Sequence, residues 1–282
     1  MAEVSPLPDD VLELGQSLVG RPTFLLGCAR SGTSILGETI AAHPRVAYLF
    51  EASQIWNRLV PETADHRLTA EAATTDIAPA IYRALADARS GLSGELLVEK
   101  NPKHVIRIPF LDALFPQSRF LHIIRDGRDT VASLMFRNRG PDWGHLKIPQ
   151  WEKLLTQYPD AHHIRCAHQW SYAVSTARQD AARLPSTRYL EVRYEALVRT
   201  PESELARLVD FLELTPDPEV NAFSGKIQDE TRNSYHAKRQ VRHYVEDHSH
   251  RIGRYRENLT ARQLKEVLAV CGPLLEALGY HD

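Results

Sequence analysis

Short apolar runs alternate along the chain with longer segments in which apolar residues recur every three or four positions. The short runs are typical of strands buried on both faces, and the longer periodicity is typical of amphipathic helices. The predicted strands cover residues 24–26, 46–50, 96–98, 120–124 and 189–192. The predicted helices cover residues 67–90, 103–115, 128–138, 165–183, 201–213 and 260–278. This alternation predicts an α/β protein of three layers, with a central, mainly parallel sheet flanked by helices.

Two stretches, residues 52–95 and 139–164, are longer than a crossover between parallel strands needs. Because ligands bind such sheets at the carboxyl ends of the strands, we interpret both stretches as insertions over this edge. They contain Trp56, Trp143 and Trp151, which either pack in the core or stack on a ligand. Residues 1–21 are expected to form an arm or a short helix. No linker or repeat divides the pattern, so residues 1–282 are predicted to form a single domain.

Composition and charge argue against several classes of protein. Of the 282 residues, 43% are hydrophobic and 25% are charged, and the formal net charge is -2. A general nucleic-acid binder needs a basic surplus, so we expect no nucleic-acid partner. No apolar run approaches the roughly 18 residues of a membrane span, and the acidic amino-terminal stretch does not resemble a signal peptide. Three scattered cysteines without metal-type spacing favour a reducing compartment, so we expect a cytoplasmic protein without a metal site.

The first apolar run leads into a loop rich in small residues, Gly27-Cys-Ala-Arg-Ser-Gly-Thr-Ser34. Two glycines separated by four residues form the frame of a P-loop, in which backbone amides point at a phosphate. A nucleoside-triphosphatase loop has lysine where Thr33 stands, whereas the cation here is Arg30. The loop therefore favours one terminal phosphate group over β- and γ-phosphates with Mg²⁺. A structural strand-to-helix turn is the alternative interpretation. The candidate ligand groups are Arg30, Ser31, Gly32, Thr33 and Ser34.

A second candidate phosphate site follows a later strand, in the segment Arg125-Asp-Gly-Arg-Asp-Thr-Val-Ala-Ser133. We expect Arg125 at the tip of the strand and Ser133 inside the next helix, so both could reach one phosphate. Arginine offers a charge-assisted fork and serine offers a hydroxyl. Taken alone, the segment is equally consistent with a structural salt bridge at the end of a strand.

Together the two segments resemble the sulfotransferase family, whose members use 3′-phosphoadenosine 5′-phosphosulfate (PAPS). The resemblance implies a P-loop-like fold, PAPS as co-substrate, and metal-independent transfer of a sulfuryl group to an acceptor hydroxyl. It implies that residues 30–34 bind the 5′-phosphosulfate and that Arg125 and Ser133 bind the 3′-phosphate. The stretches 52–95 and 139–164 would then lie on the acceptor side.

Two further segments resemble the part of the family that lies near the nucleotide. Tyr194-Glu-x-Leu looks like the family's Tyr-Glu-x-Leu segment, which implies that Tyr194 lies beside the nucleotide. The segment around Arg254 resembles its Gly-x-Trp-Lys stretch, but the usual preceding Arg-Lys-Gly is missing. The resemblance therefore implies that Arg251, or one of Arg254 and Arg256, meets the 3′-phosphate. Cytosolic members have a tryptophan near the adenine where Ile35 stands, so adenine stacking must come from elsewhere.

The general base is predicted by comparing branches of the same family. Cytosolic members use a histidine in a Lys-Thr-His segment, but Pro102 stands in its place after Lys100-Asn101. Glu51 directly follows an apolar strand, which resembles the tyrosylprotein and carbohydrate branch, where such a glutamate is the base. We therefore predict Glu51 as general base, with Arg30 and Lys100 stabilising the sulfuryl group and the leaving phosphate. A carboxylate that merely favours a helix N-terminus is the alternative for Glu51.

Two other functions stay open from the sequence. One is an ATP-dependent P-loop kinase, which would depend on Mg²⁺; the missing lysine and the lack of a clear Walker-B carboxylate count against it. The other is a nucleotide-binding module without catalysis. For the sulfotransferase, the expected partner is a hydroxyl-bearing acceptor, either a carbohydrate, a tyrosyl group or a natural product. The identity of this acceptor and the possibility of a homo-oligomer are left open.

Overall fold

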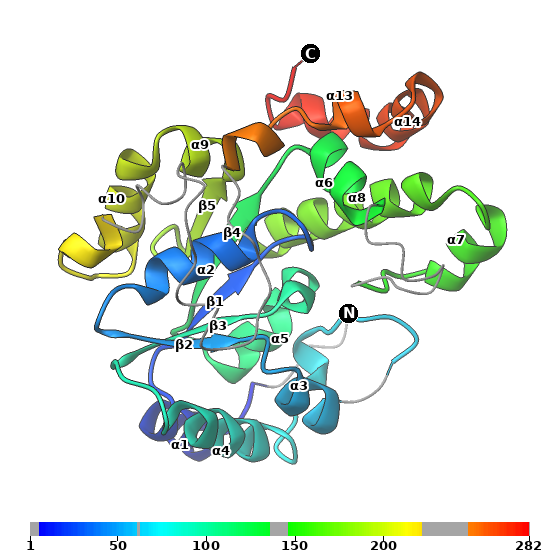
Figure 1. Cartoon of the computed structure of the whole chain (residues 1–282). Coiled ribbons are helices and arrows are strands. Elements are labelled where there is room, and N and C mark those ends of the chain that lie inside the picture. Colours follow the sequence, from blue (N-terminus) through cyan, green and yellow to red (C-terminus); the bar gives the residue numbers. More distant parts are fainter. Residues whose placement is uncertain (1–5, 61–62, 136–145, 222–247, 282) are drawn as a thin grey trace.

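The computed structural model describes residues 6–60, 63–135, 146–221 and 248–281 (Figure 1). Within these ranges the strands are β1 (Thr23–Leu26), β2 (Val46–Phe50), β3 (Leu96–Lys100), β4 (Arg119–Ile124) and β5 (Tyr189–Arg193). The α-helices are α1 (Asp9–Leu18), α2 (Thr33–Ala41), α3 (Ser53–Leu59), α4 (Ala78–Arg89), α5 (Ile108–Leu114), α6 (Gly127–Met135), α7 (Trp151–Gln157), α8 (His162–Ala181), α9 (Tyr194–Arg199), α10 (Pro201–Phe211), α13 (Tyr255–Asn258) and α14 (Ala261–Ala277). The 3₁₀ helices are η1 (Ala70–Ala72), η2 (Pro102–Ile106) and η3 (His248–Arg251).

The strands form one sheet in the order β2-β3-β1-β4-β5, and every neighbouring pair is parallel. The register places Lys100 of β3 beside Leu25 of β1 and beside Phe50 of β2. At the other side of the sheet, Ile124 of β4 lies beside Arg193 of β5. Because all five strands point the same way, their carboxyl ends share one edge. The predicted parallel sheet is confirmed.

Helices cover both faces of the sheet and complete three layers (Figure 1). Successive side chains of β1 alternate between the faces, so Phe24 and Leu26 join one buried cluster and Leu25 joins the other. Residues of α1, α4, α5, α6, α8 and α14 pack in the first cluster. Residues of α2, α9 and α10 pack in the second. Burial on both faces explains why the strands read as unbroken apolar runs.

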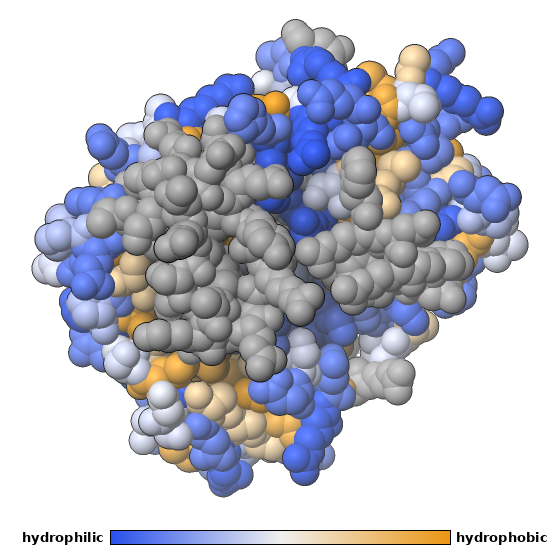
Figure 2. Space-filling view, in the orientation of Figure 1, coloured by the Kyte–Doolittle hydropathy of each residue, from blue (hydrophilic) through white to orange (hydrophobic). Residues whose placement is uncertain are grey.

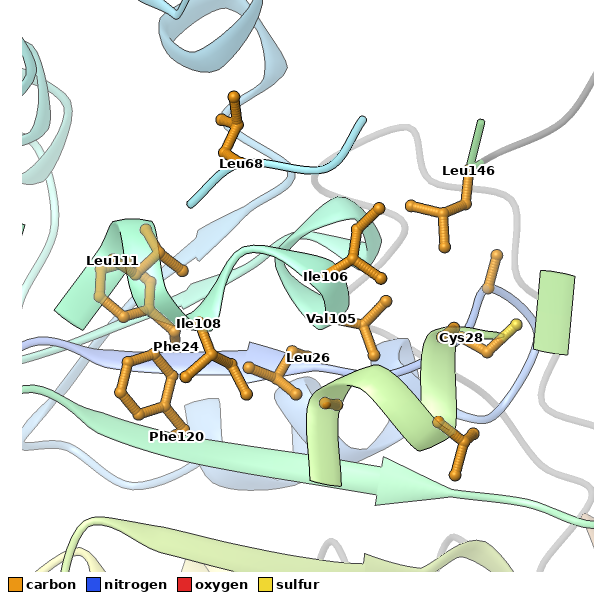
Figure 3. Packing of buried hydrophobic residues seen from close by; sticks show 14 of the residues in the cluster. Phe24, Leu26, Cys28, Leu68, Val105, Ile106, Ile108, Leu111, Phe120 and Leu146 are labelled. Carbon is orange, nitrogen blue, oxygen red and sulfur yellow. The ribbon is translucent and has the colours of Figure 1, made fainter. Parts of the chain in front are cut away.

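Figure 3 shows the part of the first cluster that lies beside η2 and α5. Phe24 and Phe120 stack with their ring centroids 5.9 Å apart, and Ile108 of α5 packs in the same cluster. Leu68 and Leu146 come from the two predicted insertions, and both are buried. Both insertions are therefore anchored to the main core of the protein.

Two predicted helices begin later than the periodicity indicates, and proline is the physical reason. The helix predicted over 67–90 is α-helical only from Ala78, with Pro79 in its first turn. The helix predicted over 103–115 divides into η2 and α5, with Pro109 in the first turn of α5. Proline lacks an amide hydrogen and clashes with the preceding turn, so it is tolerated at a helix start but not in the interior.

The stretch 52–95 also contains an ordinary crossover helix. Helix α4 packs against α1 and contacts β2, as expected for the helix that joins β2 to β3. The tryptophans Trp56 and Trp151 are 1% and 3% exposed and belong to the core, whereas Trp143 lies outside the described residues. Among the helices in the described ranges, none combines the length and the apolar character that a bilayer crossing requires.

Candidate functional site

The strand order places the predicted site residues along one edge of the sheet. From β2 to β5, the strands end in turn at Glu51, at Lys100, in the loop with Arg30, at Arg125 and at Tyr194. This edge is where open parallel sheets bind ligands. We name the ends of β2 and β3 the Glu51 half, and the ends of β1, β4 and β5 the Arg125 half.

The loop after β1 has the conformation of a phosphate-binding turn. Gly32 has a φ of 96°, in the left-handed region, and a Cβ there would lie 2.5 Å from the Tyr194 ring. Helix α2 begins at the next residue, Thr33, so the amides of its first turn lack helical partners. The Ser31 hydroxyl is buried and has no hydrogen-bond partner among the described residues. A buried hydroxyl of this kind suits a ligand oxygen.

Arg30 joins the two predicted phosphate motifs. It has a φ of 73°, which is rare for a residue with a side chain. Its Nε donates to Ser133 Oγ at 3.2 Å, and its carbonyl accepts from Arg125 Nη1, also at 3.2 Å. Segments that are far apart in the sequence therefore meet side chain to side chain.

A cavity of about 210 Å³ lies where these residues meet. Its described lining consists of Arg30, Arg125, Asp129, Ser133, Arg251, Arg254 and Asn258. The Arg125 guanidinium lies 4.5 Å over the Tyr194 ring, and its buried Nε has no partner among the described residues. Four arginines around one small cavity, against a single carboxylate, provide a site for an anion.

Asp129 holds the carboxyl-terminal segment against this cavity. Its carboxylate accepts from the backbone amides of Gly253 at 2.8 Å and Tyr255 at 2.9 Å, and Arg125 lies 3.7 Å away. Burial raises the pKa of Asp129, and Arg125 acts in the opposite direction. The sequence alone did not reveal this role, and the repeated Arg-Asp pair of the motif was its only signal.

Arg251 and Arg254 line the cavity, whereas Arg256 does not. Arg256 lies 4.6 Å over the ring of Tyr255 and lines a separate cavity of about 550 Å³, together with Arg128. Of the three arginines considered for the 3′-phosphate, the structure therefore brings two to the other predicted phosphate ligands.

The turn after β4 is held in place by a hydrogen bond from a buried tryptophan. Trp170 of α8 donates its indole N–H to the carbonyl of Arg125 at 3.1 Å. A Cβ on Gly127 would lie 2.7 Å from the Trp170 ring, so only glycine allows this close approach. The direction in which Arg125 leaves the strand is thereby set by the core.

Glu51 and Lys100 form an ion pair in the Glu51 half. Lys100 Nζ donates to the Glu51 carboxylate and lies 4.4 Å from the centroid of the Phe50 ring. The Lys100 side chain is 2% exposed and that of Glu51 is 40% exposed, so the carboxylate is the accessible member. Glu51 has a φ of 45°, and its amide donates to the Lys100 carbonyl at 2.8 Å. Backbone strain of this kind clusters at functional sites.

Burial lowers the pKa of Lys100, and three nearby carboxylates oppose that change. The strongest is Glu51, followed by Glu99 and Glu38. These acids offset part of the cost of burying the ammonium group. Neither Glu99 nor Glu38 was singled out from the sequence. Each is a carboxylate among mostly buried residues, in β3 and α2 respectively, and burial cannot be read directly from the sequence.

Glu99 is the centre of a buried polar network behind this ion pair. Its carboxylate accepts from Trp56 Nε1 at 3.0 Å and lies 2.6 Å from His104 Nε2. Trp56, Glu99 and His104 are each at most 1% exposed. Trp56 belongs to α3, which follows Glu51, and His104 belongs to η2, which follows Lys100. The network therefore ties together the elements that carry both members of the pair.

Comparisons with known proteins identify relatives of this chain. Protein-tyrosine sulfotransferase 2 of Gallus gallus is 27% identical over 201 residues, which cover 67% of this chain and 50% of that protein. This chain thus spans about half the length of that relative. A sulfotransferase domain from the curacin biosynthetic pathway shares the fold with a TM-score of 0.56 and 17% identity, over 90% of this chain and 97% of that one.

A mouse sulfotransferase crystallised with PAP also shares the fold, with a TM-score of 0.50 and 13% identity, over 96% of this chain and 94% of that one. The decisive match is to a family model described as the Sulfotransferase family, which covers residues 22–219, more than half of the chain. The chain therefore belongs to the Sulfotransferase family.

Proposed function

We propose that this protein transfers a sulfuryl group from PAPS to an acceptor hydroxyl. The observation that carries the proposal is the meeting of two separate anion-binding motifs at Arg30 and Ser133, beside an arginine-lined cavity. PAPS bears one phosphate at the 3′ position and a phosphosulfate at the 5′ position. A protein that binds it needs two anion sites held at a fixed separation, which the shared edge of the sheet supplies.

The described residues fit this co-substrate. Residues 30–34 would hold the 5′-phosphosulfate, and the unpartnered Ser31 hydroxyl suits one of its oxygens. Tyr194, which lies under the Arg125 guanidinium, would lie beside the nucleotide. PAPS would supply the sulfuryl group and leave as 3′-phosphoadenosine 5′-phosphate (PAP). The 3′-phosphate would be held by Arg125, Ser133, Arg251 and Arg254.

We assign the general base to Glu51. Its carboxylate is accessible at the edge of the sheet, so it can accept the proton of an acceptor hydroxyl. A positioned base contributes about 10²–10⁴-fold to a rate. Protonation of Glu51 would also weaken its pairing with Lys100, which would leave that ammonium available to the developing negative charge. Arg30 would stabilise the same charge.

Thermal unfolding in the presence of PAP tests the donor site. PAP at ~100 times its dissociation constant should stabilise the protein by about 2.7 kcal/mol. AMP, which lacks the 3′-phosphate, should stabilise it less at the same concentration. Stabilisation by ATP with Mg²⁺ but not by PAP would overturn the proposal in favour of a kinase.

Transfer of radiolabelled sulfur from PAPS to a panel of hydroxyl compounds then tests the reaction. The panel covers sugars, tyrosyl peptides and hydroxylated lipids or polyketides. Binding of PAP without transfer to any of them would favour a nucleotide-binding module over an enzyme. We further propose a cytoplasmic location, which the three free and buried cysteines support.

A further inference from the structure

The two predicted insertions contact each other at His66 and Lys147. The His66 amide donates to the Lys147 carbonyl at 2.7 Å, and the Lys147 amide donates to His66 Nδ1 at 2.9 Å. The neighbouring residues Leu68 and Leu146 are both buried in the main core (Figure 3). The contact is therefore a fixed part of the fold.

Three cationic side chains gather around this contact. Arg107 Nε donates to the His66 carbonyl at 2.9 Å, and Lys103 Nζ donates to Asn57 Oδ1 at 3.3 Å. Lys147 is the third cation. We name Lys103, Arg107 and Lys147 the basic cluster. Its members come from η2, from the turn that follows it, and from the second insertion.

No carboxylate among the described residues forms an ion pair with any member of the basic cluster. The nearby acids that the structure describes have other partners. Asp65 accepts from the backbone amide of Arg67 at 2.8 Å, and Asp180 pairs with the Arg67 side chain. The charge of Glu99 acts to raise the pKa of Arg107, but the two carboxylate oxygens of Glu99 are bound to Trp56 and His104.

The charges of the cluster act on one another and on His66. Burial, followed by the charges of Lys103, Arg107 and Lys147, lowers the pKa of His66 to about 3. Burial also lowers the pKa of Lys103, with Arg107 and Lys147 as the next causes. His66 is therefore neutral at pH 7, and three like charges repel one another in a partly buried place. Such an arrangement is unfavourable unless an anion compensates it.

The basic cluster lies on the Glu51 half of the edge. Asn57, which binds Lys103, belongs to α3, the helix that begins two residues after Glu51. Lys103 itself follows Lys100 on the same strand-to-turn connection. In Figure 2, the described residues that show between the grey atoms in the middle of the view are mainly hydrophilic. The basic cluster, which has no ion-pair partner among the described residues, thus lies on the half of the edge that carries the proposed base.

We propose that the basic cluster binds an anionic group of the acceptor, so that the accepted hydroxyl belongs to a molecule that also bears a carboxylate, sulfate or phosphate. The inference rests on the proposed function, because it assigns the Glu51 half to the acceptor. The anion would compensate Lys103, Arg107 and Lys147 and fix the position of the hydroxyl relative to Glu51.

Lysine acetylation followed by mass spectrometry tests the proposal in solution. The protein, in the presence of PAP, is treated with an amine-reactive acetylating reagent in sodium sulfate or in sodium chloride of equal ionic strength. Sulfate should slow acetylation of Lys103 and Lys147 several-fold relative to chloride. Lys153, exposed on the nearby helix α7, should react equally in both salts. Acetate in place of sulfate identifies a preference for carboxylates.

A matched pair of variants distinguishes binding of sulfate at the basic cluster from general screening of charge by the salt. Lys147→Gln should remove the protection of Lys103, whereas Lys153→Gln, with the same loss of charge, should keep it. Equal reactivity in both salts, or equal slowing of all lysines, overturns the proposal. If PAP stabilises the protein but protection is absent, only this inference fails. If PAP does not stabilise it, the proposed function fails, whatever sulfate does at the basic cluster.

Discussion

The two halves of the carboxyl edge are constructed in different ways. The Arg125 half takes its groups mainly from two short motifs, residues 30–34 and 125–133, which a side-chain hydrogen bond joins directly. The Glu51 half takes its groups from β2, β3, η2 and both insertions, each of which contributes one or two residues. The proposed co-substrate site is thus encoded mainly in contiguous segments, whereas the proposed acceptor site depends on tertiary contacts.

The largest effect that would sharpen this comparison is on the rate. Glu51→Gln should lower sulfuryl transfer by about 10²–10⁴-fold, because the acceptor hydroxyl loses its base. PAP affinity should stay unchanged, since the substitution leaves the Arg125 half intact. Glu95→Gln, which alters an exposed carboxylate that pairs with Arg45, is the matched control and should keep full activity. A Glu51→Gln variant with wild-type rate would remove Glu51 from the mechanism.

The next largest effect is on stability, and it tests whether the buried network around Glu99 stabilises the Glu51 half. Glu99→Ala should lower the free energy of unfolding by about 3–5 kcal/mol, because it leaves His104 and the Trp56 indole N–H buried without a partner. Trp56→Phe removes a single hydrogen bond and should cost about 1–3 kcal/mol. Urea unfolding measures both changes. If Glu99→Ala lowered the free energy of unfolding by less than an ordinary surface substitution does, the network would not stabilise this half of the edge.

A smaller effect distinguishes two arginines of one segment in the Arg125 half. Arg254→Gln should weaken PAP binding about 10- to 100-fold, since a hydrogen bond to a charged group contributes about 1.5–3 kcal/mol. Arg256→Gln should leave PAP affinity within the error of the titration, because Arg256 lines the other cavity. Calorimetric titration of both variants gives the comparison. Equal losses would show that charge, and not position, determines the binding.

The last effect is a pH dependence centred on the Glu51 half. The pKa of His66 is lowered to about 3 in the folded protein. Between pH 6.5 and 3, His66 therefore binds a proton in the unfolded chain but not in the folded protein. Stability should therefore fall as the pH falls from 6.5 toward 3, and the fall should be shallower in His66→Gln. His122, also lowered to about 3 but buried in the sheet, is an internal control in a proton NMR titration. Added sulfate should raise the pKa of His66 and leave that of His122 unchanged.

Much of the fold could be predicted because its signals are local. The strands read as apolar runs since both faces of the sheet are covered, and the P-loop reads from its glycines. The starts of α4 and α5 were predicted too early because hydrophobic periodicity carries no information on where Pro79 and Pro109 interrupt hydrogen bonding.

The site was predictable to the extent that its residues belong to motifs. Arg30, Arg125 and Ser133 were named from spacing, and the structure brings them together. Asp129, Glu99 and the basic cluster were not assigned roles, because their partners lie far away in the sequence. A carboxylate inside an apolar strand signals that it has a buried partner, but it does not say which residue that partner is.

Arg30 and Glu51 share a backbone feature that bears on protein engineering. Both have positive φ values, 73° and 45°, in a region where a side chain costs about 1–2 kcal/mol and glycine is unstrained. Glycine at either position should therefore make the protein more resistant to heat while removing a group to which the proposed reaction assigns a role. A selection for thermal stability alone would then enrich variants that lack these groups, so any stabilised form of this protein should be chosen with sulfuryl transfer measured in parallel.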